Sequence, residues 1–309
     1  MENKSDTQDI NLLQIKEWTE TLKLNREINV EDHWNRIEGK MHGLRLKRNI
    51  FYFIRNIAAI LLLPVLVSTY YLLGHKNSEQ EIIPQIELAA AYGQVAKITL
   101  PDSSVVWLNS GSKISYPQRF TGETRTVKLE GEAYFKVHAD KKHRFDVAVP
   151  DALTASAYGT EFNISAYTED SKTEITLVEG NLEIISASLN HTLDIKPSNQ
   201  VLYDKTANTL AVEEVNLYVK TAWKDGKMVF RKTHFSEVVN RLSRHFNVDI
   251  ELKDNVLLNY EFSATFTAET IEEILRLLEK TSPIRWTMTK PKQLDNLEFS
   301  KRKIIVMKK

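Results

Sequence analysis

From Gly93 onward, the hydrophobic residues fall in short runs of the kind that forms β-strands. Segments such as VAKITL, SVVWLN and TRTVKLEG are rich in β-branched or aromatic residues. Turn-forming pairs such as Pro101-Asp102 and Tyr116-Pro117 separate them. The same rhythm continues to about residue 215 without helical spacing. We therefore predict an all-β domain over residues 93–215, built from many short strands.

The spacing becomes helical after about residue 220. Phe235, Val238, Val239, Leu242 and Phe246 recur at intervals of a helical face. A second helix is expected after a capping box that starts at Thr270, and strand-like runs such as VDIEL and IRWTMT flank both helices. The pattern predicts a C-terminal α+β module of order β-α-β-β-α-β-β over residues 222–309.

Residues 1–50 carry two short amphipathic patterns. Leu12, Ile15, Thr19 and Leu22 share one helical face with Trp18 beside it, and a second pattern places Trp34, Ile37 and Met41 at helical spacing. Two helices of this size cannot bury a sizeable core by themselves. Their apolar faces therefore need a partner, and the residues expected to bind it are Trp18, Leu22, Trp34 and Ile37.

The stretch from Ile57 to Gly74 contains no charged residue. With the preceding aromatic residues it approaches the roughly 20 apolar residues that a membrane helix needs, so a transmembrane helix is expected over residues 53–74. Positive charges precede this stretch and acids follow it, and this asymmetry predicts an N-terminus in the cytoplasm. Residues 75–92 are expected to form a linker. The predicted chain is thus membrane-anchored, with a short α-helical cytoplasmic segment, one transmembrane helix, an all-β periplasmic domain and a C-terminal α+β domain.

Composition limits the chemistry that the chain can perform. The formal net charge is zero, which argues against direct binding of nucleic acid. No cysteine is present, which excludes disulfides, cysteine-zinc sites and a thiol nucleophile. The eight histidines are scattered, and His138 and His143 beside Asp140 are best interpreted as a solvated loop. No metal or cofactor is therefore expected.

A carbohydrate-binding or hydrolytic β-sandwich is the alternative from another functional class. It would need paired acids or an exposed aromatic surface. Glu130, Glu132 and Glu179 adjoin glycines at strand ends, where solvation is the simpler interpretation, and strand alternation makes several of the aromatic candidates core residues. Those aromatic candidates are Trp107, Tyr116 and Tyr134.

Several longer motifs occur together and in order. They read ITLPDSSVVWLNSGSKISYP (98–117), VKLEGEAYFKV (127–137), RFDV (144–147), GTEFNISAY (159–167) and LVEGNLEI (177–184). This series resembles the FecR-type anti-sigma regulators. Residues 230–252 and 262–284 are similar to the family's usual C-terminal companion, which is related to the short signalling domains of secretins and TonB-dependent receptors. One departure is LDIKPSNQ (193–200), where the family more often has a glycine after the proline.

The resemblance implies a regulatory protein of the inner membrane and not an enzyme. Its cytoplasmic segment would bind an extracytoplasmic-function sigma factor. Its periplasmic part would receive a signal from the N-terminal signalling domain of an outer-membrane TonB-dependent transporter. The strand around Tyr260, Glu261, Phe262 and Ser263 is the edge that we expect to take that signal. The secretin-like module also leaves open a structural role in a secretion apparatus.

The same resemblance draws attention to the pair Gly159-Thr160, because some FecR-type relatives are cut within it. The hydroxyl of Thr160 would attack the carbonyl of Gly159 and give an ester that water opens. An uncut turn before the strand EFNISAY is the alternative. The glycines Gly111, Gly131, Gly159 and Gly180 are expected at turns that need a positive φ.

Overall fold

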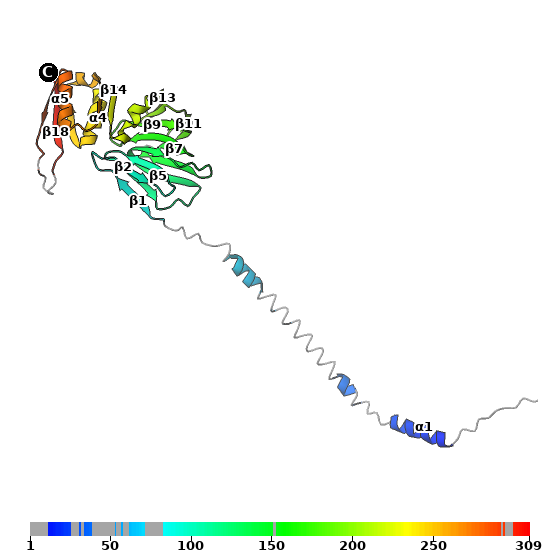
Figure 1. The fold of residues 1–309 in the computed structure, drawn as a ribbon. Helices are drawn as coiled ribbons and strands as arrows, with labels where there is room; N and C mark the ends of the chain where they lie inside the picture. The colour runs from blue at the N-terminus through cyan, green and yellow to red at the C-terminus, as the bar shows by residue number, and fades with distance from the viewer. Residues whose placement is uncertain are drawn as a thin grey trace, which may run out of the picture. The chain divides into compact units, whose positions relative to one another are not determined.

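The structure is a computed structural model of the 309-residue chain (Figure 1). It describes residues 12–25, 31, 34–38, 53, 57, 62–71, 83–150, 153–291, 293 and 299–309. The chain divides into two units, Met1–Glu81 and Ile82–Lys309, which are described one at a time.

The first unit contains helix α1 (Leu12–Asn25) and a helical stretch at residues 34–38. The side chains of α1 that the structure describes are exposed, and the Thr19 hydroxyl donates a hydrogen bond back to the carbonyl of Ile15 at 2.9 Å. Asn29 and Met41, expected in the second helix, lie outside the described residues. Both predicted amphipathic segments are thus helical where they are described.

The expected transmembrane helix over residues 53–74 is not supported. Within the described residues, no helix is both long enough and apolar enough to cross a membrane. The longest described helical run there is 62–71. At 1.5 Å per residue it would cover only about half of a hydrocarbon layer of about 30 Å. Residues 54–56, 58–61 and 72–74 of the prediction lie outside the described part of the chain.

The second unit begins with thirteen strands in two layers (Figure 1). One layer has the strand order β11-β10-β7-β6-β5-β4-β1, and the other has β13-β12-β9-β8-β5-β3-β2. The strands are β1 (Gln85–Ala89), β2 (Ala96–Thr99), β3 (Val105–Leu108), β4 (Lys113–Pro117), β5 (Thr124–Lys136), β6 (Arg144–Val149), β7 (Leu153–Ala157), β8 (Glu161–Ala166), β9 (Lys172–Glu179), β10 (Leu182–Ser186), β11 (His191–Ile195), β12 (Asn199–Asp204) and β13 (Thr209–Glu214).

The long strand β5 belongs to both layers. Residues 124–130 pair with β6 and β4, whereas residues 131–136 pair with β8 and β3. Gly131 stands at the crossing with φ +100°, and a Cβ placed on it would lie 2.7 Å from the Cβ of Ser112. Only glycine fits both this backbone conformation and this close approach. All four glycines named from the sequence have a positive φ, as predicted.

The core of the sandwich lies between the two layers. It is built from the inward-facing residues of the alternating strands, including Phe145 of β6 and Phe162 of β8. Phe135 of β5 stacks on Phe162, with ring centroids 5.0 Å apart, and lies 6.2 Å from the ring of Phe145. The hydrophobic alternation in the sequence therefore predicts the inward face of this domain correctly.

Strand β1 corrects the expected linker over residues 75–92. Residues 85–89 pair antiparallel with β4 and extend one layer by an edge strand. Four of the five residues are exposed and only Ile86 is half-buried, so the strand buries little of its own surface. The strand forms because distant residues of β4 supply its hydrogen bonds, which local sequence does not reveal.

A short helical connection leads to the C-terminal module. It consists of α3 (Leu217–Thr221), capped by the side chain of Asn216, and the 3-10 helix η2 (Ala222–Asp225). The module then contains β14 (Met228–His234), α4 (Phe235–Phe246), β15 (Val248–Leu252), η3 (Asn255–Asn259), β16 (Glu261–Phe266), α5 (Ile271–Thr281), β17 (Ile284–Met288) and β18 (Arg302–Lys308).

The module has a core of its own between its helices and two small sheets. One sheet pairs β14 with β16, and the other has the order β15-β18-β17. The apolar faces of α4 and α5 supply Val238, Leu242, Ile274 and Leu278 to this core, and the capping box of Thr270 and Glu273 starts α5. The elements follow the β-α-β-β-α-β-β order that the sequence pattern predicts. Figure 1 shows β14 and α4 on the side nearer the sandwich.

Candidate functional site

Helix α4 turns a polar face towards the sandwich. Arg241, Arg244 and His245 stand three and four positions apart, so they share one side of the helix. The adjoining face carries Val238 and Leu242 into the core of the module. The helix therefore joins its own core on one face and the neighbouring domain on the other.

Arg244 makes the principal contact between the module and the sandwich. Its guanidinium lies 3.5 Å from the ring centroid of Tyr167. It also donates from Nη2 to Asp170 Oδ1 at 2.7 Å and from Nε to Glu169 Oε1 at 3.3 Å. Burial raises the pKa of Asp170, and the charge of Arg244 opposes that shift. The pair is only 13% and 25% exposed, so it is better protected from water than a surface ion pair.

Ser110 fastens the C-terminal end of the same helix to the sandwich. Its hydroxyl donates to the backbone carbonyl of Arg244 at 3.1 Å and accepts from the backbone N–H of Gly93 at 2.8 Å. The last carbonyls of a helix have no partner within the helix, so a donor from outside satisfies one of them. The Tyr167 hydroxyl donates to the carbonyl of Ser110 at 3.0 Å, which ties the loop to the stacked ring.

A chain of hydrogen bonds runs across the sandwich beneath the module. Asn109 and Asn163 donate to the two carboxylate oxygens of Glu132, at 2.7 and 3.0 Å. The indole N–H of Trp223 in η2 donates to the side-chain oxygen of Asn163 at 3.1 Å. Burial raises the pKa of Glu132, although both amides and the charges of Arg241 and Arg244 oppose the shift.

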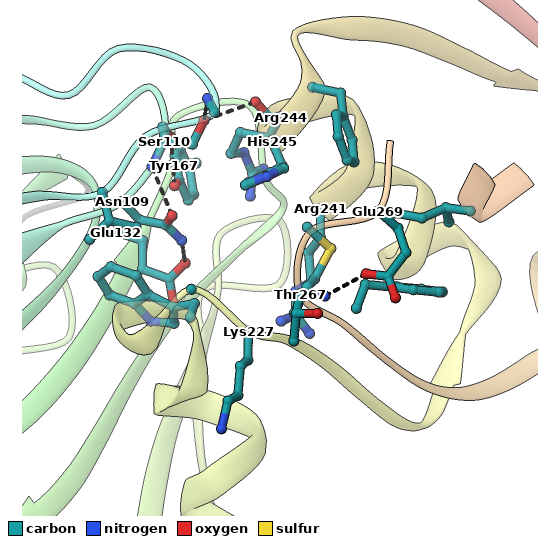
Figure 2. A pocket seen from close by; sticks show the side chains of 18 residues that line it. Asn109, Ser110, Glu132, Tyr167, Lys227, Arg241, Arg244, His245, Thr267 and Glu269 are labelled. Carbon is teal, nitrogen blue, oxygen red and sulfur yellow. Dashed lines mark hydrogen bonds between the residues drawn. The ribbon is translucent and has the colours of Figure 1, made fainter. Parts of the chain in front are cut away.

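A cavity of about 310 Å³ lies between the sandwich and the C-terminal module. Figure 2 shows Asn109, Glu132 and Tyr167 on one side of it and Arg241 and Thr267 on the other. Its apolar lining comes from Val95, Trp223, Met228, Phe246, Phe266 and Ile274. The volume is at the small end of the range for ligand pockets.

The motifs that stand out in the sequence gather at this interface. SVVWLNSGS carries Asn109 and Ser110, LEGEAYF carries Glu132, and EFNISAY carries Asn163 and Tyr167. Gly131 lets β5 pass close to Ser112, whose hydroxyl accepts from the N–H of Glu132 at 2.8 Å. These residues therefore build the surface on which the C-terminal module rests.

The residues expected to bind a sigma factor are described only in part. Trp18 is 75% exposed, Trp34 is 64% exposed and Ile37 is 50% exposed. Leu22 lies within α1, but its side chain is outside the described set. The described side chains are thus available for contact, and their role stays a prediction.

The expected signal-input edge forms strand β16 and the residue before it. Phe262 is buried and packs against Phe235 of α4, with ring centroids 4.6 Å apart. Glu261 and Ser263 are exposed on the other face. The Ser263 hydroxyl accepts from the N–H of Lys232 in β14 at 2.9 Å. Tyr260 is half-buried and its carbonyl accepts from the N–H of Phe235 at 2.7 Å.

The pair Gly159-Thr160 forms a tight turn before β8. Gly159 has φ +143°, and a Cβ there would lie 2.8 Å from the Cα of Ala139. Thr160 is 3% exposed, and its hydroxyl donates to the carbonyl of Asn181 at 2.6 Å. In this conformation the hydroxyl donates its hydrogen bond to a backbone carbonyl. Self-cleavage stays a prediction.

The aromatic and acidic candidates of the carbohydrate alternative are mostly not free for a ligand. Tyr116 and Tyr134 are buried at 6% and 3% exposure, and Trp107 packs edge-on against Tyr134 with ring centroids 5.6 Å apart. Glu132 belongs to the interface, while Glu130 is exposed in the middle of β5 and Glu179 is exposed at the end of β9. The structure therefore gives this alternative no exposed aromatic platform from these three residues.

Two of the histidines considered for metal binding lie near a loop. His143 Nδ1 and Asp140 Oδ2 are 2.7 Å apart at the surface, and the hydrogen bond from His143 lowers the pKa of Asp140 to about 2. Among the described residues, no group of three or more acids, histidines or cysteines is placed to hold a metal ion.

The interface is not among the sites predicted from the sequence, where only the apolar face of α4 is considered. The usable signal was the i, i+3, i+4 spacing of Arg241, Arg244 and His245 on the polar side of a strongly amphipathic helix. Their partners come from residues 74 to 134 positions away, which no local pattern predicts.

Two protein-family models match the chain. The model described as FecR protein matches residues 87–183, and the model described as FecR, C-terminal matches residues 227–294. Together they span just over half of the chain. No curated protein matches it significantly.

The fold is similar to solved structures of a protein from Parabacteroides distasonis ATCC 8503 that is described as a candidate anti-sigma factor. The structure at 1.65 Å aligns with a TM-score of 0.64 and 26% sequence identity. The alignment covers 72% of this chain and 99% of that chain. The structure at 2.50 Å has a TM-score of 0.62 and 26% identity, with 73% and 100% covered.

Proposed function

The chain belongs to the FecR family, and from that premise we propose that it is an anti-sigma factor whose N-terminal segment binds an extracytoplasmic-function sigma factor. One observation carries the proposed contact. Trp18 and Trp34 are largely exposed on short helices. Exposed large aromatic residues of this kind are favourable anchors in protein interfaces.

The regulatory input is proposed to come from the N-terminal signalling domain of an outer-membrane TonB-dependent transporter. Strand β16 pairs with β14 along one edge only, among the strands that the structure describes. An extended partner segment can add to the other edge through backbone hydrogen bonds. Polar changes at Glu261 should then have a small effect, because the contact uses the backbone.

The docking of α4 on the sandwich supports a route for that input within the second unit. A partner that binds the C-terminal module can strengthen or weaken the contacts of Arg244 and Ser110, which hold the module to the β domain. These contacts are few and polar, so a modest binding free energy can shift them. In this account the module and the sandwich respond together.

The location also stays a proposal. An anti-sigma factor that takes its signal from an outer-membrane protein would work at the inner membrane, with its N-terminus in the cytoplasm and residues 82–309 in the periplasm. An alkaline phosphatase fusion after residue 90 should be active, and a fusion after residue 45 should be inactive. The opposite result would reverse the orientation.

Transcription from a promoter of the cognate sigma factor tests the function itself. Removal of residues 1–50 should change the basal transcription, upward if the chain inhibits the sigma factor and downward if sigma activity requires it. Removal of residues 222–309 should abolish the response to inducer. In that deletion, further removal of residues 1–50 should still change the basal transcription. An inducer response that survives the second deletion would place the input elsewhere.

A further inference from the structure

The cavity between α4 and the sandwich is lined by acids that are largely occupied and by a guanidinium that is largely not. Both acids that line it are occupied by N–H groups of the protein. Glu132 accepts from two asparagine amides, as described above, and Glu269 accepts from the backbone N–H groups of Thr267 and Ala268 at 2.6 and 3.1 Å. Of these four carboxylate oxygens, only Oε1 of Glu269 has no hydrogen-bond partner among the described residues.

Arg241 is different, because most of its donors face no acceptor. Its Nη1 donates to the carbonyl of Val229 at 3.2 Å, and its guanidinium lies 4.6 Å from the ring centroid of Phe230. The carboxylate of Glu237 is 3.9 Å from Nη1, which is beyond hydrogen-bond length. Among the described residues, no acceptor is hydrogen-bonded to its Nε or Nη2. The side chain is 23% exposed and lines the cavity.

One further donor lies on the same wall. The hydroxyl of Thr267 has no hydrogen-bond partner among the described residues, and Figure 2 shows it beside Arg241. Lys227 also lines the cavity, but Figure 2 shows its ammonium pointing away from Arg241 and Thr267. The unpaired donors of the cavity are thus a guanidinium fork and a hydroxyl.

The rest of the lining is apolar. Met228, Phe246, Phe266 and Ile274 belong to four different elements of the module and border the same space. A guanidinium fork matches the two oxygens of a carboxylate in geometry and charge. We propose that this cavity binds a carboxylate with an apolar body, with the carboxylate at Arg241 and the body on the apolar lining. Such a group is either a small organic acid or the C-terminus of an apolar peptide.

Binding to the full-length chain by isothermal titration calorimetry tests this site. The first probes are N-acetylphenylalanine and its amide, which differ only in the carboxylate. The acid should bind at least about tenfold more tightly than the amide, because the amide loses charge-assisted hydrogen bonds. A pentapeptide that ends in Phe, with a free or an amidated C-terminus, separates the two sources. A stronger affinity for the free peptide than for the single residue assigns the site to a peptide terminus, and equal affinity assigns it to a small acid.

Variants locate the binding in the cavity. Arg241→Met should lower the affinity for the acid at least about tenfold while leaving the affinity for the amide unchanged. Arg276→Met is the matched control, since Arg276 is exposed on α5 and does not line the cavity. Lys227→Met removes a charge without breaking a described contact. It should lower the affinity for the acid less than Arg241→Met does. Equal binding of the acid and the amide, no binding of either N-acetylphenylalanine or the free peptide, or an unchanged affinity for the acid in Arg241→Met would each overturn the proposal.

Discussion

The guanidinium of Arg244 lies 3.5 Å from the ring centroid of Tyr167, and this stacked pair joins α4 to the turn between β8 and β9. Asp170 follows three residues after Tyr167 and accepts from the same guanidinium. One side chain therefore combines a cation–π contact with an ion pair across the two cores of the second unit. We therefore expect docking of the module to depend on this residue.

Arg244→Ala should loosen this docking. The change leaves Asp170 without its cation in a partly buried position and removes the stack on Tyr167. Removing one partner of a fully buried pair costs about 3–5 kcal/mol, and we expect about 2–3 kcal/mol here because the pair retains some contact with water. Urea unfolding of the full chain measures the free energy. Arg276→Ala is the exposed control, and an equal loss in both variants would contradict this role for Arg244.

Glu132→Gln tests the buried carboxylate through its pH dependence. Burial raises the pKa of Glu132 in the folded chain, so the folded state binds its proton more tightly than the unfolded state. The wild type therefore loses stability as pH rises from about 4.5 through the raised pKa. The variant lacks this loss, so the Tm of the variant minus that of the wild type should be more positive at pH 7 than at pH 4.

The comparison between the two pH values removes the fixed cost of the changed hydrogen bonds to Asn109 and Asn163. Glu130→Gln is the control, since that residue lies two positions away on the same strand and is exposed. A difference in Tm that is the same at both pH values would mean that burial does not perturb Glu132.

Much of the fold could be predicted from local sequence patterns, because buried and exposed residues alternate regularly along its strands and helices. In β5 the residues Val127, Leu129 and Phe135 are buried on one face, as the alternation predicts. In α5, Ile271, Ile274, Leu275 and Leu278 form the buried face behind the predicted capping box. These features depend on neighbours a few residues apart, which sequence periodicity records directly.

The interface did not follow from pattern because its contacts are long-range. Asn163 meets Trp223 from 60 positions away, and Ser110 meets Arg244 from 134 positions away. A polar residue such as Glu132 next to a glycine is indistinguishable in sequence from a solvated turn. Hydrophobicity alone was also insufficient for residues 53–74, where no described helix is long and apolar enough for a span.

Gly131→Ala should be severely destabilising. A methyl group there would lie 2.7 Å from the Cβ and 2.8 Å from the Cα of Ser112, on a backbone with φ +100°. Overlap with packed atoms and a disfavoured backbone together should cost more than about 3 kcal/mol. Gly122→Ala is the matched control, because its φ is ordinary and the nearest atom is 3.8 Å away. Thermal unfolding of both variants decides, and similar Tm values would contradict the crossing role of Gly131.

Self-cleavage at Gly159-Thr160 predicts a residue-specific result. The Thr160 oxygen would attack the carbonyl carbon of Gly159, the peptide C–N bond would break, and the freed amine would take the hydroxyl proton. Water then opens the ester into fragments 1–159 and 160–309. Thr160→Ser should keep this reaction and Thr160→Val should stop it. Mass spectrometry of the protein purified from cells reads the fragments, and an uncut wild type would leave Thr160 a structural residue that bonds to Asn181.

Co-purification of a sigma factor tests the central claim most directly. The full chain, tagged at its C-terminus and recovered from cells of its own species, should carry an extracytoplasmic-function sigma factor as its main partner. The double variant Trp18→Ala and Trp34→Ala should lose that partner, because both aromatic anchors are removed. A control variant, Lys16→Ala, should retain it. Recovery of no sigma factor with the wild type, or equal recovery with the double variant, would contradict the account.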